Sequence, residues 1–192
     1  MTLYTSRASR TERVSGPMPG DNVGLVCTGV RATDDPNCVV LKILGVSSTG
    51  LVVIDVQERL APAIAAAPQV AARIAALIEK AKESGIPILA TEQYSQGLGV
   101  TVPALRGRLT AGSVVEKIHF AASREAVFTE ALRTRGIRHA VIAGMEAHVC
   151  VLQSALGLLA QGLAVTLVTD AVASRADLNR DAALARLARA GA

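Results

Sequence analysis

The chain has 192 residues, of which 51% are hydrophobic, 19% charged and only 2% aromatic, and its net charge is +4. This length supports one hydrophobic core rather than two, and the scattered arginines and scarce aromatic side chains argue against nucleic-acid binding. The apolar runs fall far short of the roughly 18 residues that a membrane-spanning helix needs. Three cysteines without an apolar leader near the start are typical of a cytoplasmic protein.

Strand and helix patterns alternate from residue 51 onward. Short apolar runs predict strands, and helical spacing of apolar residues predicts the segments between them. In chain order, we expect a strand over 51–56, a helix over 68–84, a strand over 86–91, a short helix over 103–110, a strand over 113–118, a helix over 123–135, a strand over 138–143, a helix from Cys150 to about Gln161, a strand over 164–169 and a helix over 179–190. The alternation predicts a three-layer, Rossmann-like α/β fold with a doubly wound, mostly parallel sheet.

The first 49 residues differ in character from the rest. Serine, glycine, proline, aspartate and asparagine interrupt their short apolar pieces, such as residues 38–41, and these residue types favour turns over strands. We therefore predict a poorly ordered N-terminal extension over 1–49 and a folded domain over 50–192.

Cys150 follows the predicted strand 138–143 and a short turn, in the first turn of the next helix. The N-terminus of a helix stabilises negative charge, so a cysteine there has a lowered pKa and is a nucleophile near neutral pH. Such a thiol is expected to alkylate faster than Cys27 and Cys38. The alternative is a structural cysteine, because free cysteines are among the most often buried residues.

Two charged residues stand at the ends of other predicted strands. Asp55 ends a continuous apolar run, and Lys117 ends a β-branched run. Singly, each has a simple alternative, a helix cap for the aspartate and a solvated strand end for the lysine. In open parallel sheets, however, ligands bind beyond the carboxyl ends of the strands. Asp55, Lys117 and Cys150 all fall at such ends, which predicts a common site.

The local sequence around these three residues carries a family resemblance. It is found in the stretches 54–60 (IDVQERL), 91–94 (TEQY), 97–99 (GLG), 116–120 (EKIHF) and 144–153 (GMEAHVCVLQ). With this order of aspartate, lysine and cysteine, the chain resembles the isochorismatase-like cysteine hydrolases, and within them the isochorismatase domain-containing proteins.

The resemblance runs from about Gly50 to the C-terminus. It implies the isochorismatase-like hydrolase fold for residues 50–192. Relatives continue past the position of Ala192 with one more strand and a helix. The resemblance therefore implies a C-terminally short domain whose sheet lacks the last strand.

The resemblance also implies an Asp-Lys-Cys catalytic triad that works through a thioester intermediate. Cys150 attacks a carbonyl carbon, the Lys117 ammonium keeps the thiol ionised, and Asp55 takes the thiol proton and later activates water.

The turn at Met145, Glu146 and Ala147 is implied to form an oxyanion hole, with the backbone N–H groups of Glu146 and Cys150 facing the substrate oxygen. In the family, the peptide bond matching Met145–Glu146 is cis.

Four further residues are implied to line the substrate pocket, together with a partner subunit of a homo-oligomer. They are Gln57, Tyr94, Phe120 and His148. A Cys150–His148 dyad is an alternative, but residues i and i+2 of a helix do not face each other. The preferred interpretation of His148 is a polar residue at the rim of the site or at a subunit interface.

No metal ion or cofactor is expected. Nicotinamidases of the family bind a metal through an aspartate and two histidines after the second strand, whereas residues 91–99 of this chain contain no histidine. The spacing of the three cysteines and three histidines matches no zinc motif.

Three hypotheses about function follow. The first is a metal-independent hydrolase of a small amide, ureide or related compound. The second is a catalytically silent interaction protein of the same fold, against which the intact triad argues. The third is an isochorismate-type vinyl-ether hydrolase, in which Asp55 acts as the acid and the cysteine is dispensable.

Overall fold

The computed structural model describes residues 48–192 of the chain. Its strands are β1 (Thr49–Ile54), β2 (Ile88–Gln93), β3 (Val114–Lys117), β4 (His139–Met145) and β5 (Ala164–Ala173). Its helices are α1 (Ala67–Glu83), α2 (Ser95–Leu98), α3 (Pro103–Arg106), α4 (Ala126–Thr134), α5 (Leu152–Ala160) and α6 (Asp177–Ala190), with short turns η3 (Ala61–Ala63), η4 (Ala122–Arg124) and η5 (Ala147–Val151). Nearly all of the predicted extension, residues 1–47, lies outside the described residues.

The five strands form one parallel sheet in the order β3-β2-β1-β4-β5. The predicted doubly wound α/β fold is therefore confirmed. The chain builds outward from β1 in one direction and then returns to build outward through β4 in the other. The strand order therefore reverses between β1 and β4, and open α/β sheets bind ligands beyond the carboxyl ends of the strands at such a reversal.

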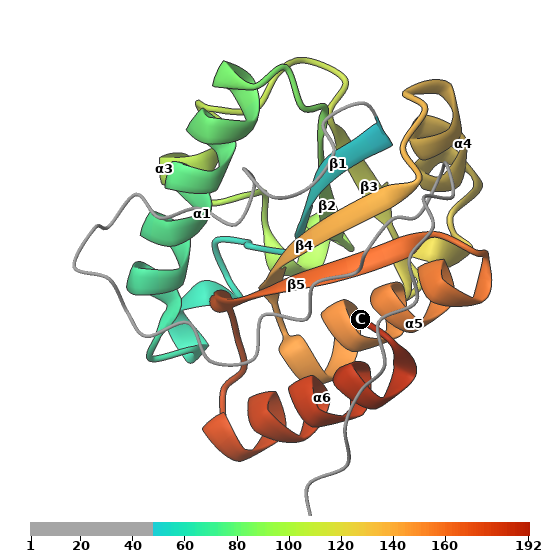
Figure 1. Ribbon diagram of the computed structural model, residues 1–192. Helices are drawn as coiled ribbons and strands as arrows, with labels where there is room; N and C mark the ends of the chain where they lie inside the picture. The colour runs from blue at the N-terminus through green and yellow to red at the C-terminus, as the bar shows by residue number, and fades with distance from the viewer. Residues whose placement is uncertain (1–47) are drawn as a thin grey trace, which may run out of the picture. The chain divides into compact units, whose positions relative to one another are not determined.

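Helices cover both faces of the sheet (Figure 1). Leu51 and Val53 of β1 pack into a core cluster with α1, whereas Val52 and Ile54 pack into a second cluster with α4, α5 and α6. Because successive side chains of a strand point to opposite faces of the sheet, β1 is buried on both of its faces. This arrangement explains why its sequence reads as a continuous apolar run rather than as an alternating one.

Most element boundaries lie within three residues of the predictions, and at three elements the difference is larger or affects the site. The helix predicted over 103–110 is limited to Pro103–Arg106, because the chain leaves the helix at Gly107. The last strand runs on to Ala173, past a break in its register with β4 between Ile142 and Gly144. The second strand begins after Pro87 and continues to Gln93 instead of 91. This extension brings Gln93 level with Lys117.

Gly144 of β4 lies against the backbone of Ile54, its register partner on β1. Its φ is +137°, and a Cβ there would overlap the backbone of Ile54. We expect Gly144→Ala to destabilise the fold by about 3 kcal/mol, from backbone strain and overpacking together. Gly107→Ala is the matched control, since only a carbonyl oxygen 4.0 Å away meets its Cβ. Urea denaturation of both variants checks this, and equal stabilities would contradict it.

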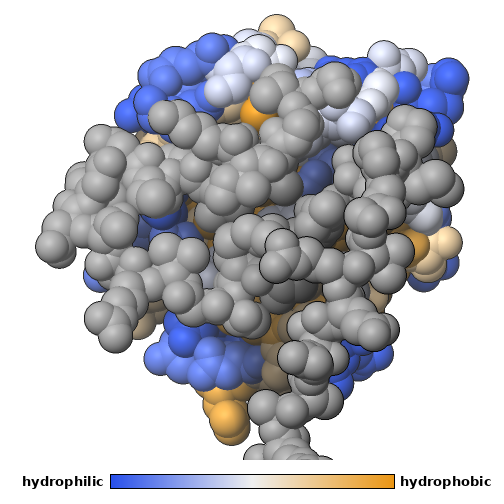
Figure 2. Space-filling view, viewed as in Figure 1, coloured by the Kyte–Doolittle hydropathy of each residue, from blue (hydrophilic) through white to orange (hydrophobic). Residues whose placement is uncertain are grey.

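Figure 2 shows hydrophilic side chains gathered over α4, on which Glu130 and Arg133 are exposed. Among residues 48–192, no helix combines the length and apolar character needed to cross a bilayer.

Candidate active site

Asp55 lies one residue beyond β1 and is completely buried. Its φ is +49°, in the left-handed region, and Tyr94 is the one other described non-glycine residue with a positive φ. The Thr91 hydroxyl donates a hydrogen bond of 2.6 Å to Oδ1 of Asp55, and the Lys117 ammonium lies 2.7 Å from Oδ2. A buried carboxylate held at both oxygens in an uncommon backbone conformation is typical of a functional site.

Lys117 is the last residue of β3 and reaches across β2 to Asp55. Its side chain is completely buried. Besides the ion pair, Nζ donates to Oε1 of Gln93 at 2.7 Å and to the carbonyl oxygens of His119 at 3.3 Å and Phe120 at 3.2 Å. The ammonium is therefore surrounded by oxygen atoms and fixed in one position.

Cys150 lies in η5, a π-helical turn that follows β4, and it is 5% exposed. The turn is closed by the carbonyl oxygen of Glu146, which accepts hydrogen bonds from the N–H groups of Val149 and Val151. Asp55 and Lys117 both lie close enough to the thiol to change its pKa. The three residues predicted to share a site therefore lie together at the carboxyl edge of the sheet.

The predicted lowering of the Cys150 pKa is not found. Burial of the thiol, together with the charge of Asp55, raises the pKa of Cys150 to about 12, against the lowering effect of Lys117. The start of a helix lowers the pKa of a thiol, but burial raises it by more, because removing the charged thiolate from water costs more free energy than the helix dipole supplies. Burial also raises the pKa of Asp55 above its ordinary 3.8, while Lys117 and the hydroxyl of Thr91 oppose this. The resting form of Cys150 is thus the thiol, beside a carboxylate that can accept its proton.

The turn predicted to form the oxyanion hole lies beside Cys150. Met145, Glu146 and Ala147 are all buried. The peptide bond from Met145 to Glu146 is trans, as is every peptide bond of the described residues, so the implied cis bond is absent. The trans form is the one that non-proline peptides favour by about 3–4 kcal/mol. Here Gly144, at a positive φ, and the wide π-helical turn redirect the chain.

The predicted pocket residues divide into two kinds. Tyr94 and Phe120 are each 53% exposed and follow the strands that carry Gln93 and Lys117, so they are placed to meet a ligand. Gln57 is instead completely buried. Its side chain bonds to the backbone of Gln93 and to the carbonyl oxygen of Gly99, so its polar atoms already have partners, and its role in the pocket stays a prediction.

His148 faces away from Cys150. Nδ1 lies 3.0 Å from the Ser174 hydroxyl and 3.3 Å from a Glu146 carboxylate oxygen, and Nε2 lies 3.5 Å from the Asn179 amide. Both ring nitrogens are therefore engaged with other groups, which argues against a cysteine–histidine dyad. The Glu146 carboxylate is also bound by Nε of Arg175 at 2.6 Å.

Thr91 and Gln93 contact the charged residues of the site, although the sequence did not mark them as site residues. Both occur in the TEQY stretch, where they were noted for resemblance alone. The available signal in the sequence was a run of three consecutive polar residues at the end of an apolar strand. The structure shows that all three, at the end of β2, are buried. Buried polar side chains at the carboxyl end of a central strand indicate a hydrogen-bonded network.

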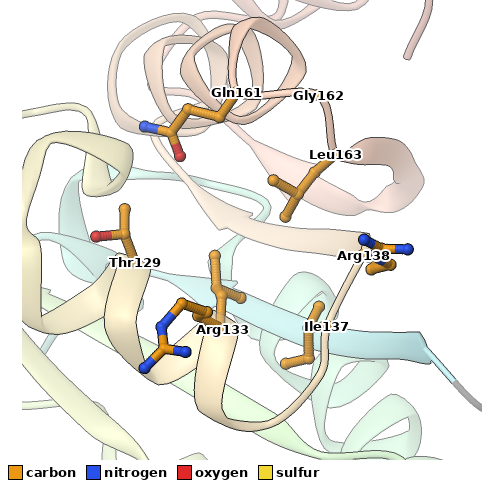
Figure 3. A pocket seen from close by; sticks show the side chains of 8 residues that line it. Thr129, Arg133, Ile137, Arg138, Gln161, Gly162 and Leu163 are labelled. Atoms are coloured by element: carbon orange, nitrogen blue, oxygen red, sulfur yellow. The ribbon is translucent and has the colours of Figure 1, made fainter.

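The described residues contain no group of three or more histidine, cysteine or acidic side chains arranged to hold a metal ion. A cavity of about 550 Å³ lies at the opposite edge of the sheet, near the start of β4 (Figure 3). Leu132, Ile137 and Leu163 line it together with Arg138 and Gln161. It is separate from the triad, because it opens at the amino ends of the strands.

Comparisons with known proteins show the family to which the chain is similar. The family model described as "Isochorismatase domain" matches residues 49–192. Isochorismatase domain-containing protein 2A of Mus musculus is 38% identical over 146 residues, which cover 76% of this chain and 69% of that protein. Isochorismatase domain-containing protein 1 of Danio rerio is also 38% identical, but the match spans only 48% of its length.

Two solved structures have similar folds. MAR1 ribonuclease from Caenorhabditis elegans aligns with a TM-score of 0.73 and 35% identity, covering 78% of this chain and 77% of that one. The YcaC gene product from Escherichia coli, described as an octameric hydrolase of unknown specificity, aligns with a TM-score of 0.73 and 25% identity, covering 78% and 75%.

Proposed function

The chain belongs to the isochorismatase family, and we propose that it is a metal-independent cysteine hydrolase of a small amide or ureide. The observation that carries the proposal is the buried contact of Cys150 with Asp55 and Lys117. A thiol, a carboxylate with a raised pKa and a fixed ammonium are the groups that nucleophilic attack on a carbonyl needs.

The raised pKa of the thiol supports the following order of events. Asp55 accepts the Cys150 proton as the sulfur attacks the carbonyl carbon, and Lys117 balances the resulting negative charge. The C–N bond then breaks, the leaving amine takes the proton from Asp55, and the acyl group stays on the sulfur as a thioester. Water attacks next and gives a proton to Asp55. The C–S bond breaks, the acid leaves, and the proton returns to the thiol.

The proposal includes a homo-oligomer. Its support is the octameric state of the Escherichia coli relative and the exposure of Tyr94 and Phe120 beside the triad, which leaves room for a second subunit to complete the pocket. Light scattering on the purified chain measures this directly.

A screen for ammonia release from primary amides and ureides tests the activity. RNA belongs in a parallel assay, because a relative is described as a ribonuclease. Turnover is expected to rise with pH through the raised pKa of Asp55, since only the deprotonated carboxylate accepts the thiol proton. EDTA is expected to leave the rate unchanged. Turnover that EDTA removes and zinc restores, or a rate that falls as Asp55 deprotonates, would contradict the mechanism.

A further inference from the structure

Gln93 has a place in the site that the triad does not explain. It is the last residue of β2 and the register partner of Lys117 on β3. Its side chain is buried, with Oε1 accepting from Lys117 Nζ at 2.7 Å and Nε2 donating to the carbonyl oxygen of Ile118 at 2.7 Å. Because Nε2 must face a carbonyl oxygen, the amide oxygen is turned toward the ammonium.

The backbone of Gln93 is held as firmly as its side chain. Oε1 of Gln57 accepts from the Gln93 N–H at 2.8 Å, while Nε2 of Gln57 donates to the carbonyl oxygen of Gln93 at 3.1 Å and to that of Gly99 at 2.6 Å. Two buried glutamines thus fix the end of β2 against the loop before α3. A buried, fully bonded network of this kind keeps its members in one arrangement.

The charge balance explains why an amide suits this position. Asp55 and Lys117 are both completely buried and form an ion pair at 2.7 Å, so their charges cancel. A neutral acceptor at 93 holds the ammonium without changing this balance. A carboxylate there would leave one buried negative charge in excess beside Cys150, and a nearby negative charge disfavours the thiolate.

We propose that Gln93 is a positioning residue, whose neutral amide holds the Lys117 ammonium where it can stabilise the sulfur of Cys150. The inference rests on the proposed cysteine hydrolase function and adds to it a residue outside the triad. It requires that position 93 be an uncharged hydrogen-bond acceptor. A side chain of the same size without these properties does not meet the requirement. Gln93→Glu changes the charge at position 93, and Gln93→Met removes the hydrogen-bond acceptor, so the two variants test the two properties separately.

The test is the rate of Cys150 alkylation by iodoacetamide as a function of pH, followed by peptide mass spectrometry. Gln93→Glu is expected to slow alkylation about tenfold at every pH below the pKa of the thiol, as a rise of about one unit in that pKa would do. Gln96→Glu is the matched control, because it makes the same change at an exposed position three residues away. Its curve is expected to overlie that of the unmodified protein.

Gln93→Met keeps position 93 neutral but removes the acceptor. Its alkylation curve is expected to shift by less than half as much as that of Gln93→Glu, while turnover of an amide found in the screen falls about tenfold because the ammonium loses one partner. If circular dichroism shows that Gln93→Glu does not fold, the turnover of Gln93→Met becomes the test of the inference. Wild-type turnover in Gln93→Met would then overturn the inference.

The outcomes separate the inference from the function on which it rests. If turnover needs Cys150 but the Gln93→Glu and Gln96→Glu curves coincide, the positioning role is wrong and the hydrolase proposal stands. If Cys150→Ala retains full turnover, both the hydrolase proposal and the inference about Gln93 are wrong.

Discussion

Asp55→Asn is expected to reduce turnover by about 10³–10⁴-fold, as loss of the partner carboxylate does in other nucleophile–base systems. The same change is expected to speed alkylation of Cys150. Burial and the charge of Asp55 raise the pKa of the thiol, whereas Lys117 lowers it. An amide at 55 removes one of the two raising effects and leaves the lowering effect of Lys117 in place. Faster alkylation with lost turnover would identify Asp55 as the group that moves protons, rather than one that merely holds the fold.

Two variants control this experiment. Cys150→Ala is expected to lose turnover to the same extent, because a catalytic unit fails when any member is lost. Asp170→Asn makes the same change in a surface carboxylate paired with Arg73 and is expected to leave turnover unchanged. Slower alkylation in Asp55→Asn would mean that the carboxylate does not oppose the thiolate, contrary to the geometry.

Lys117→Met is expected to lower the free energy of unfolding by about 3–5 kcal/mol, because it leaves the Asp55 carboxylate buried without its counterion. Adding Asp55→Asn is expected to recover part of this loss, since the double variant holds no unpaired charge. The recovery separates the cost of an isolated charge from the cost of lost packing. Urea denaturation of both variants gives the two values.

Lys80→Met is the control for the loss of a lysine. Lys80 pairs with Glu83 on the surface of α1, with both side chains well exposed, and exposed pairs contribute about 0–1 kcal/mol. If Lys117→Met were no less stable than Lys80→Met, the ion pair with Asp55 would not be a buried one.

The fold was open to prediction because its signals are local and repeated. Continuous apolar runs such as 51–54 mark strands buried on both faces, and Gly85 and Gly136, both with positive φ, mark the ends of helices. The grouping of Asp55, Lys117 and Cys150 also followed from the sequence, because each ends or follows a parallel strand. These inferences need only the order of elements and the rule that such sheets bind ligands at one edge.

The protonation state of the site could not be predicted in this way. The pKa of Cys150 depends on how completely the thiol is buried and on which side of it Asp55 lies, and neither is a property of local sequence. The contact of Gln93 with Lys117 depends on the register between β2 and β3. The contacts of Gln57 could not be predicted for the same reason, because its hydrogen-bond partners lie 36 and 42 residues away in the sequence.

The most direct test of the central claim is to trap the acyl group on Cys150. An amide that is turned over is mixed with the protein, quenched with acid and examined by intact mass and peptide mapping, with hydroxylamine added in a parallel reaction. We expect an added mass equal to the acyl group on the Cys150 peptide, and a hydroxamate in the parallel reaction. Hydrolysis with neither product, at the same rate in Cys150→Ala, would contradict the claim.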